Sequence, residues 1–345
     1  MKRRWSLGAR ASLVAFCALA LAGCKPATVS EAEAKGDVAW LSTNSSPEAI
    51  AALGRLADKN PKAVTVLGSK AATDLNVYIA AWGATLRGAA WGPGVLRAGL
   101  TDPVRAESAA SAMARHDPHL TQFVPDLEAA LSRIGSGSQN VAVAGVLASI
   151  GAPAKAAVER RLADKNTRGL MCRGISSTDA TDEARKSLLS APESSRDDAA
   201  CVDAVVRIAT TDDATLQWMA TTGEPGLLTA AGKTDIMPCP RMRALWSEAI
   251  AQRPPAAYLV LAVPLAHTLK RCVKDMDALL AETIAKKPGA QVLVVGGVDP
   301  YGTETTELKA TCAALPMVVR GGSAPPRTKD RAADTLAHGC RASKP

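Results

Sequence analysis

The chain has 345 residues, of which 47% are hydrophobic and only 3% aromatic. This length suits one elongated domain or two compact ones. The core must be built from Ala, Leu, Val and Ile, and because Ala is the best helix former we expect an all-α protein. Part of the formal charge of +8 comes from Lys2, Arg3, Arg4 and Arg10. The sequence contains no run of about five like charges, so a nucleic-acid-binding tail is excluded.

Residues 1–23 have the layout of a secretory signal peptide. A basic start, Met1–Arg4, precedes a short apolar run that is too short for a membrane-spanning helix of about 20 residues. The segment ends in four residues that resemble the lipobox of bacterial lipoproteins: Leu21, Ala22, Gly23 and Cys24. The resemblance implies cleavage before Cys24, a lipid such as palmitate on this cysteine, and anchoring of the mature chain to a membrane.

The residues after the expected cleavage site indicate a destination and a spacer. Lys25, rather than Asp, follows Cys24. This resembles lipoproteins sorted to the outer membrane, so we expect a periplasm-facing protein of the cell envelope. Residues 24–46 are small and polar, and we interpret them as a flexible tether between the lipid and the folded domain.

Helical periodicity begins at Pro47, directly after the capping residue Ser46. The spacing of apolar residues predicts a further helix over Pro118–Ile134. Another is expected over residues 141–150, and the next begins at Pro153. A succession of helices with short breaks is typical of stacked αα-hairpins.

An internal echo supports a repeated architecture. The hexapeptide Arg55–Asn60 recurs letter for letter as Arg161–Asn166, which is about three units of 35 residues later. Nearby segments resemble HEAT-type repeats. Residues 147–151 match the Leu-x-x-Ile-Gly helix end of that family, and Ala152–Val158 match its Pro-Ala helix start.

Two further segments carry the same resemblance. Residues 102–113 resemble the second helix of a HEAT unit with one extra residue, and residues 124–127 resemble its first helix, kinked at a proline. The resemblance implies a HEAT-like αα-hairpin solenoid over residues 47–170.

The region 171–340 is less regular. Helices are predicted over residues 197–208, 241–251, 257–272 and 275–284. The apolar stretch Gln291–Gly297 is either a buried strand or a short buried helix. We expect residues 341–345 to be a disordered tail.

The cysteines predict disulfides. Of the eight in the chain, Cys17 leaves with the signal peptide and Cys24 takes the lipid. An even number remains for an oxidising compartment, although six cysteines allow 15 pairings. Three sequential pairs are each separated by about 30 residues, close to one helical hairpin. We therefore expect bridges between Cys172 and Cys201, between Cys239 and Cys272, and between Cys312 and Cys340.

Chemistry-bearing motifs are scarce. The closest pair of histidines, His116 and His119, flanks Pro118 and lacks further metal ligands, so we interpret it as a polar turn. His267 lies in an apolar helix and is expected to pack there, and His338 is expected near the surface or near a bridge. We find no nucleophile elbow and no phosphate loop. We therefore expect no metal site, no cofactor and no enzymatic activity.

Two functional hypotheses follow. The first is a membrane-anchored scaffold that holds a protein partner on its solenoid surface, with the membrane as its other partner through the lipid on Cys24 and without nucleic acid. The alternative is an envelope enzyme or small-ligand receptor with a pocket in the C-terminal half.

Overall fold

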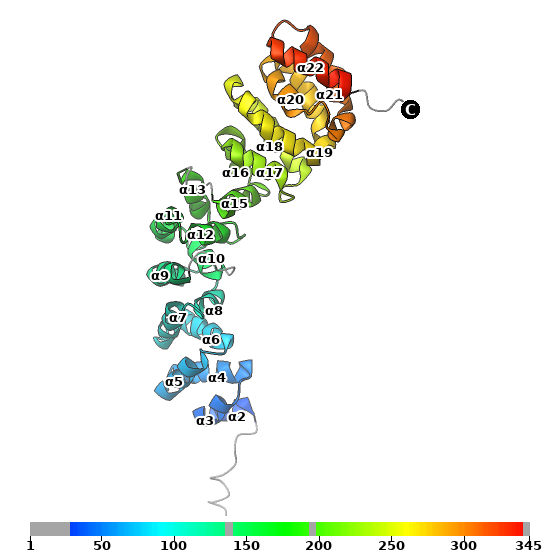
Figure 1. Cartoon of the computed structure of the whole chain (residues 1–345). Helices are drawn as coiled ribbons and strands as arrows, with labels where there is room; N and C mark the ends of the chain where they lie inside the picture. The colour runs from blue at the N-terminus through cyan, green and yellow to red at the C-terminus, as the bar shows by residue number, and fades with distance from the viewer. Residues whose placement is uncertain (1–27, 135–140, 193–197, 341–345) are drawn as a thin grey trace, which may run out of the picture. The chain divides into compact units, whose positions relative to one another are not determined.

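The computed structural model describes residues 28–134, 141–192 and 198–340, and all regular secondary structure in them is helical (Figure 1). The prediction of an all-α protein is confirmed. The chain divides into two compact units, residues 1–134 and 135–345. The predicted signal peptide, the lipobox and the predicted tail lie outside the described residues.

The helices of the first unit are short and follow one another closely. They are α2 (Val29–Ala34), α3 (Val38–Thr43), α4 (Pro47–Ala57), α5 (Pro61–Lys70), α6 (Leu75–Leu86), α7 (Trp91–Thr101), α8 (Ala106–Ser111), the 3-10 helix η1 (Pro118–Phe123) and α9 (Val124–Ile134).

The second unit is larger and contains one long helix. Its α-helices are α10 (Ala142–Ala148), α11 (Lys155–Ala163), α12 (Arg168–Ile175), α13 (Asp182–Ser190), α15 (Ala199–Ala209), α16 (Asp213–Thr221), α17 (Pro225–Lys233), α18 (Cys239–Gln252), α19 (Tyr258–Lys286), α20 (Gln291–Gly297), α21 (Lys309–Arg320) and α22 (Pro326–His338). In its described residues, 3-10 turns join these helices: η2 (Ala152–Ala154), η3 (Pro255–Ala257), η4 (Pro288–Ala290) and η5 (Thr303–Glu307).

Many helix starts are fixed by a side chain that satisfies a free backbone amide. Ser46 accepts from the amide of Ala49 at 3.2 Å and precedes Pro47, as the sequence predicted. Similar caps begin the helices α2, α3, α5, α6, α13, α15 and α16. A Ser, Thr, Asp or Asn in the short break before a helix therefore fixes the residue at which that helix begins.

The helices pack in a regular order within each unit. In the first unit, α4 contacts α5 and α6, α6 contacts α7 and α8, and α7 contacts α8 and α9. In the second unit, α15 contacts α16 and α17, and α19 contacts α20 and α21. A helix therefore commonly contacts the next helix and the next but one. Successive helical hairpins that pack against each other have this pattern of contacts.

Basic side chains tie helices about one hairpin apart. Arg133 of α9 donates to the carbonyl of Leu100 in α7, 33 residues earlier, and Arg241 donates to Ala209, 32 residues earlier. Arg331 donates to the carbonyl of Val295, 36 residues earlier. The acceptors lie in the last turns of their helices, where carbonyls have no helical partner. Cations at these ends also favour the helix dipole.

The core consists mainly of Ala, Leu, Val and Ile, as the composition predicted. The few aromatic residues are nevertheless placed centrally, since Trp246, Tyr78 and Phe123 are among the largest fully buried side chains. The indole of Trp246 donates to Thr268 at 2.9 Å. Large aromatic rings therefore fill the space that small aliphatic side chains leave between the helices.

The predicted flexible tether over residues 24–46 is wrong for residues 28–43. Helices α2 and α3 form there and pack against α4, with Ala32 and Leu41 fully buried. Glu33 also binds Arg55 of α4 through two hydrogen bonds of 2.6 and 2.7 Å. A few apolar residues in a polar segment are sufficient here because the flank of α4 offers them a surface.

The predicted helix over Pro118–Ile134 begins later than expected. Residues 118–123 form the 3-10 helix η1, and α9 starts at Val124. Pro125 therefore lies in the first turn of α9, where proline is tolerated, and does not kink a longer helix.

The echo between residues 55–60 and 161–166 is local. Both copies end one helix and approach the next. Leu162 is buried whereas Leu56 is only half-buried, and Ala57 is buried whereas Ala163 is exposed. The two copies therefore share a helix end but not an equivalent place in the core.

The C-terminal half is helical throughout its described residues. Gln291–Gly297 forms α20, which settles the alternative between strand and helix. The predicted helices 257–272 and 275–284 are the two parts of α19, which is broken at Cys272 by non-helical backbone angles. By length and composition, the described segment Pro255–Lys286 meets the criteria for a membrane-spanning helix, as some core helices also do.

Candidate functional site

The predicted cysteine pairs are all present in the second unit. Disulfides join Cys172 to Cys201, Cys239 to Cys272, and Cys312 to Cys340. The sequential pairing predicted from the spacing is confirmed. Two bridges join neighbouring helices, α12 to α15 and α18 to α19. The third joins α21 to Cys340, which lies just after α22. These cysteines therefore cross-link helices of the second unit.

The lipidation residues predicted from the sequence cannot be placed on the fold. Leu21, Ala22, Gly23 and Cys24 lie outside the described residues. Their assignment therefore stays a prediction from the sequence.

The histidines are dispersed. Asp117 binds the ring of His119 at 2.8 Å and also accepts from its backbone amide, so this segment is a polar turn. His267 is half-buried, and burial, together with Lys233 and Lys270, lowers its pKa. His338 is paired with Asp334 at 2.8 Å. Within the described ranges, no group of three His, Cys, Asp or Glu residues is placed to hold a metal ion.

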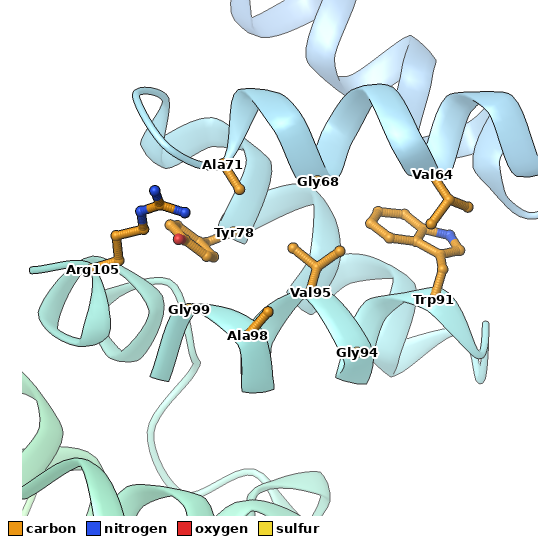
Figure 2. A pocket seen from close by; sticks show the side chains of 10 residues that line it. All are labelled: Val64, Gly68, Ala71, Tyr78, Trp91, Gly94, Val95, Ala98, Gly99 and Arg105. Atoms are coloured by element: carbon orange, nitrogen blue, oxygen red, sulfur yellow. The ribbon is translucent and has the colours of Figure 1, made fainter. Parts of the chain in front are cut away.

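An open hollow lies between α5 and α7 in the first unit (Figure 2). Its volume is about 280 Å³. The two helices present small residues to it, which keeps the space between them open. The lining residues are Val64, Gly68, Ala71, Tyr78, Trp91, Gly94, Val95, Ala98, Gly99 and Arg105.

Glycines create this space. A Cβ atom added at Gly68 or Gly94 would meet no atom within 4 Å. A Cβ atom at Gly99 would instead lie 2.5 Å from the Tyr78 ring. Gly99 is therefore required for the position of that ring, whereas Gly68 and Gly94 leave the hollow unfilled.

One end of the hollow is polar. Tyr78 is only 2% exposed, and its hydroxyl proton meets no acceptor in the described part of the chain. Figure 2 shows the Arg105 guanidinium beside this hydroxyl. Nε of Arg105 pairs with Asp102 at 3.0 Å. Burial raises the pKa of Tyr78, Asp102 raises it further and Arg105 opposes the shift, so the phenol stays protonated at neutral pH.

The other end of the hollow is aromatic. Figure 2 shows Trp91 there, facing Val64 of α5. The indole nitrogen donates to Asp58 at 2.8 Å, and Asp58 is also paired with Arg87 at 3.3 Å. These bonds hold the ring in one orientation. Beyond Trp91 lies a second hollow of about 430 Å³, which shares Val64 and Trp91 with the first.

Sequence reasoning did not identify this site. It directed the search for a pocket to the C-terminal half, where two hollows of the second unit are smaller, at about 210 and 160 Å³. A usable signal was present in glycines inside helices, such as Gly68 and Gly94, since each costs about 1 kcal/mol relative to Ala. A glycine inside a helix is favourable despite this cost where a larger side chain would fill a binding site.

Comparisons with known proteins add no identity. No protein-family model, no curated protein and no solved structure matches this chain.

Proposed function

We propose that this chain is a membrane-anchored lipoprotein whose helical-repeat body binds a partner protein at the cell envelope. The pattern of contacts between helices carries this proposal, because within each unit a helix commonly contacts the next helix and the next but one. Stacks of this kind expose long surfaces, and their usual work is to hold a partner. The HEAT-like character inferred from residues 47–170 belongs to the same proposal.

The membrane address rests on the sequence. Leu21–Cys24 resembles a lipobox, and Lys25 resembles the signal for the outer membrane. The three disulfides support an oxidising compartment such as the periplasm, since cytosolic proteins rarely keep such bridges.

A surface on the second unit supports partner binding. Three aliphatic side chains on one face of α19 stand in solvent: Leu259 is 69%, Val260 57% and Val263 62% exposed. Contiguous apolar side chains on a soluble surface commonly mark an interaction site. We include this face in the proposed partner-binding surface.

The anchor is tested by metabolic labelling with a palmitate analogue and by membrane fractionation of the wild type and of Cys24→Ala. We expect the label and the membrane association to be lost in the variant. A Cys24→Ala chain that stays in the membrane fraction would overturn the anchor.

Partner binding is tested in cells with a photo-crosslinking residue at Val263, and at exposed Asp330 of α22 as a matched control. We expect one discrete adduct from position 263, only in the anchored form and not from position 330. Empty lanes at position 263, or the same adduct at both positions, would refute the scaffold.

A further inference from the structure

The hollow between α5 and α7 combines an apolar length with one polar end. Trp91 and Gly99 are eight residues apart on α7, so the lining helix runs about 12 Å between the two ends. Along this length, α5 and its C-cap contribute Val64, Gly68 and Ala71, and α7 contributes Gly94, Val95 and Ala98. The side chains between the two ends therefore offer apolar contacts and no hydrogen-bonding group.

This lining disfavours a peptide as the occupant. An extended peptide carries an amide and a carbonyl at every residue, and each needs a partner when it is buried. Val64 of α5 and Gly94, Val95 and Ala98 of α7 lie inside their helices, where the backbone groups are used in helical hydrogen bonds. An aliphatic chain carries no such groups and fits this surface without loss.

The polar end of the hollow, unlike its apolar middle, needs a hydrogen-bonding group from its occupant. The Tyr78 hydroxyl is buried and its proton has no acceptor in the described part of the chain, which is costly. Arg105 acts on this hydroxyl as a hydrogen-bond donor, so it cannot supply that acceptor. As a protonated phenol, Tyr78 can donate one hydrogen bond. Arg105 lies beside it with Nε already held by Asp102 (Figure 2). Because the hydroxyl is fully buried, a carbonyl or carboxyl oxygen at this end would lie close to the guanidinium and would accept from Tyr78 after a shift of the Arg105 side chain.

We propose that the α5–α7 hollow binds a single aliphatic acyl chain of about ten carbons, with its carbonyl or carboxyl group at Tyr78 and Arg105 and its methyl end toward Trp91. This site is separate from the proposed partner-binding face on α19 and does not depend on it. A free fatty acid and an ester-linked acyl chain share this chemistry.

The test uses the full-length mature chain carrying Cys24→Ala, which removes any lipid of its own. Decanoic acid, methyl decanoate and decane are titrated by isothermal titration calorimetry, together with hexanoic and octanoic acids. We expect one site for decanoic acid and an affinity that falls about fourfold for each methylene removed. Binding of the acid alone assigns a free fatty acid. Equal binding of the methyl ester assigns an ester-linked chain.

Matched variants tie the binding to this hollow. Gly94→Leu fills the open space and should abolish binding, whereas Gly226→Leu on α17 adds the same side chain at another glycine with nothing within 4 Å and should leave it unchanged. Tyr78→Phe keeps the ring and should weaken decanoic acid about tenfold without affecting decane. Circular dichroism confirms that each variant is folded.

Three results would overturn the proposal. These are no heat from any acyl probe, equal binding by the Gly94→Leu and Gly226→Leu chains, and the same affinity for decane and decanoic acid. The last result would show that the Tyr78 end selects no head group.

Discussion

Replacement of Arg253 by Ala should destabilise the second unit more than any ordinary surface substitution. Arg253 directly follows α18, and its guanidinium lies against the C-terminal end of α16. Its Nε donates to the carbonyl of Ala220 at 2.5 Å, and its Nη2 donates to the carbonyls of Met219 and Gly223 at 2.9 and 2.6 Å. Carbonyls in the last turn of a helix have no helical partner, so this guanidinium completes the end of α16.

The magnitude follows from these three bonds. A hydrogen bond to a charged group contributes about 1.5–3 kcal/mol, but such values are not additive. Arg253 is half-buried, and burial lowers its pKa, so part of the gain is spent on desolvating the guanidinium. We expect a loss of about 2–4 kcal/mol for Arg253→Ala. Arg253→Lys keeps the charge without the planar fork, so it should lose about half as much.

Urea unfolding of the Cys24→Ala chain, followed by circular dichroism, measures the total loss. Hydrogen exchange measured by mass spectrometry locates it, and the amides of α16 should lose protection first. Arg320→Ala is the control, because Arg320 is exposed and its one bond, to Pro316 within the same helix, is long at 3.4 Å. If both alanine variants lose the same stability and α16 stays protected, the reasoning about helix-end carbonyls is wrong.

Three further outcomes are expected. Gly94→Ala should raise the unfolding free energy by about 0.5–1 kcal/mol, because Ala favours the helix and its methyl group meets no neighbour; a lower melting temperature would contradict this. Cys172→Ala should cost about 2–4 kcal/mol through loss of the bridge to Cys201, and a reductant should then have a smaller further effect than on the wild type. Hydrogen bonds from Arg55 hold the pKa of Glu33 below its ordinary 4.5. The stability that this pair contributes is therefore present above pH 4.5 and lost as the pH falls through the lowered pKa, so Glu33→Gln should cost under about 1 kcal/mol at pH 7 and nothing in strong acid.

The parts of the fold that depend on local chemistry could be predicted from the sequence. Ser46 before Pro47 fixed a helix start, and the spacing of the cysteines indicated which pairs meet. Both features depend on residues that lie close together in the sequence or one hairpin apart. The break of α19 at Cys272 also fell where two separate helices were predicted.

Features that depend on distant surfaces could not be predicted. Residues 28–43 are polar enough to suggest a tether. Ala32 and Leu41 are buried because α2 and α3 pack against α4, which this segment alone does not indicate. The hollow between α5 and α7 could not be predicted from the sequence for the same reason. Its ends, Tyr78 and Trp91, belong to different helices, and nothing in their local sequence indicates that they share one space.

The placement of the disulfides has a consequence for how the chain matures. All three bridges lie between Cys172 and Cys340, and residues 28–134 contain no cysteine. A chain made from its N-terminus completes the first unit before any of these thiols is synthesised. That unit can reach its native packing without an oxidant, whereas the second unit gains the stability of its three bridges only after its thiols are oxidised. A cell short of oxidising capacity should therefore accumulate chains that are protease-resistant up to about residue 134 and cleavable beyond it.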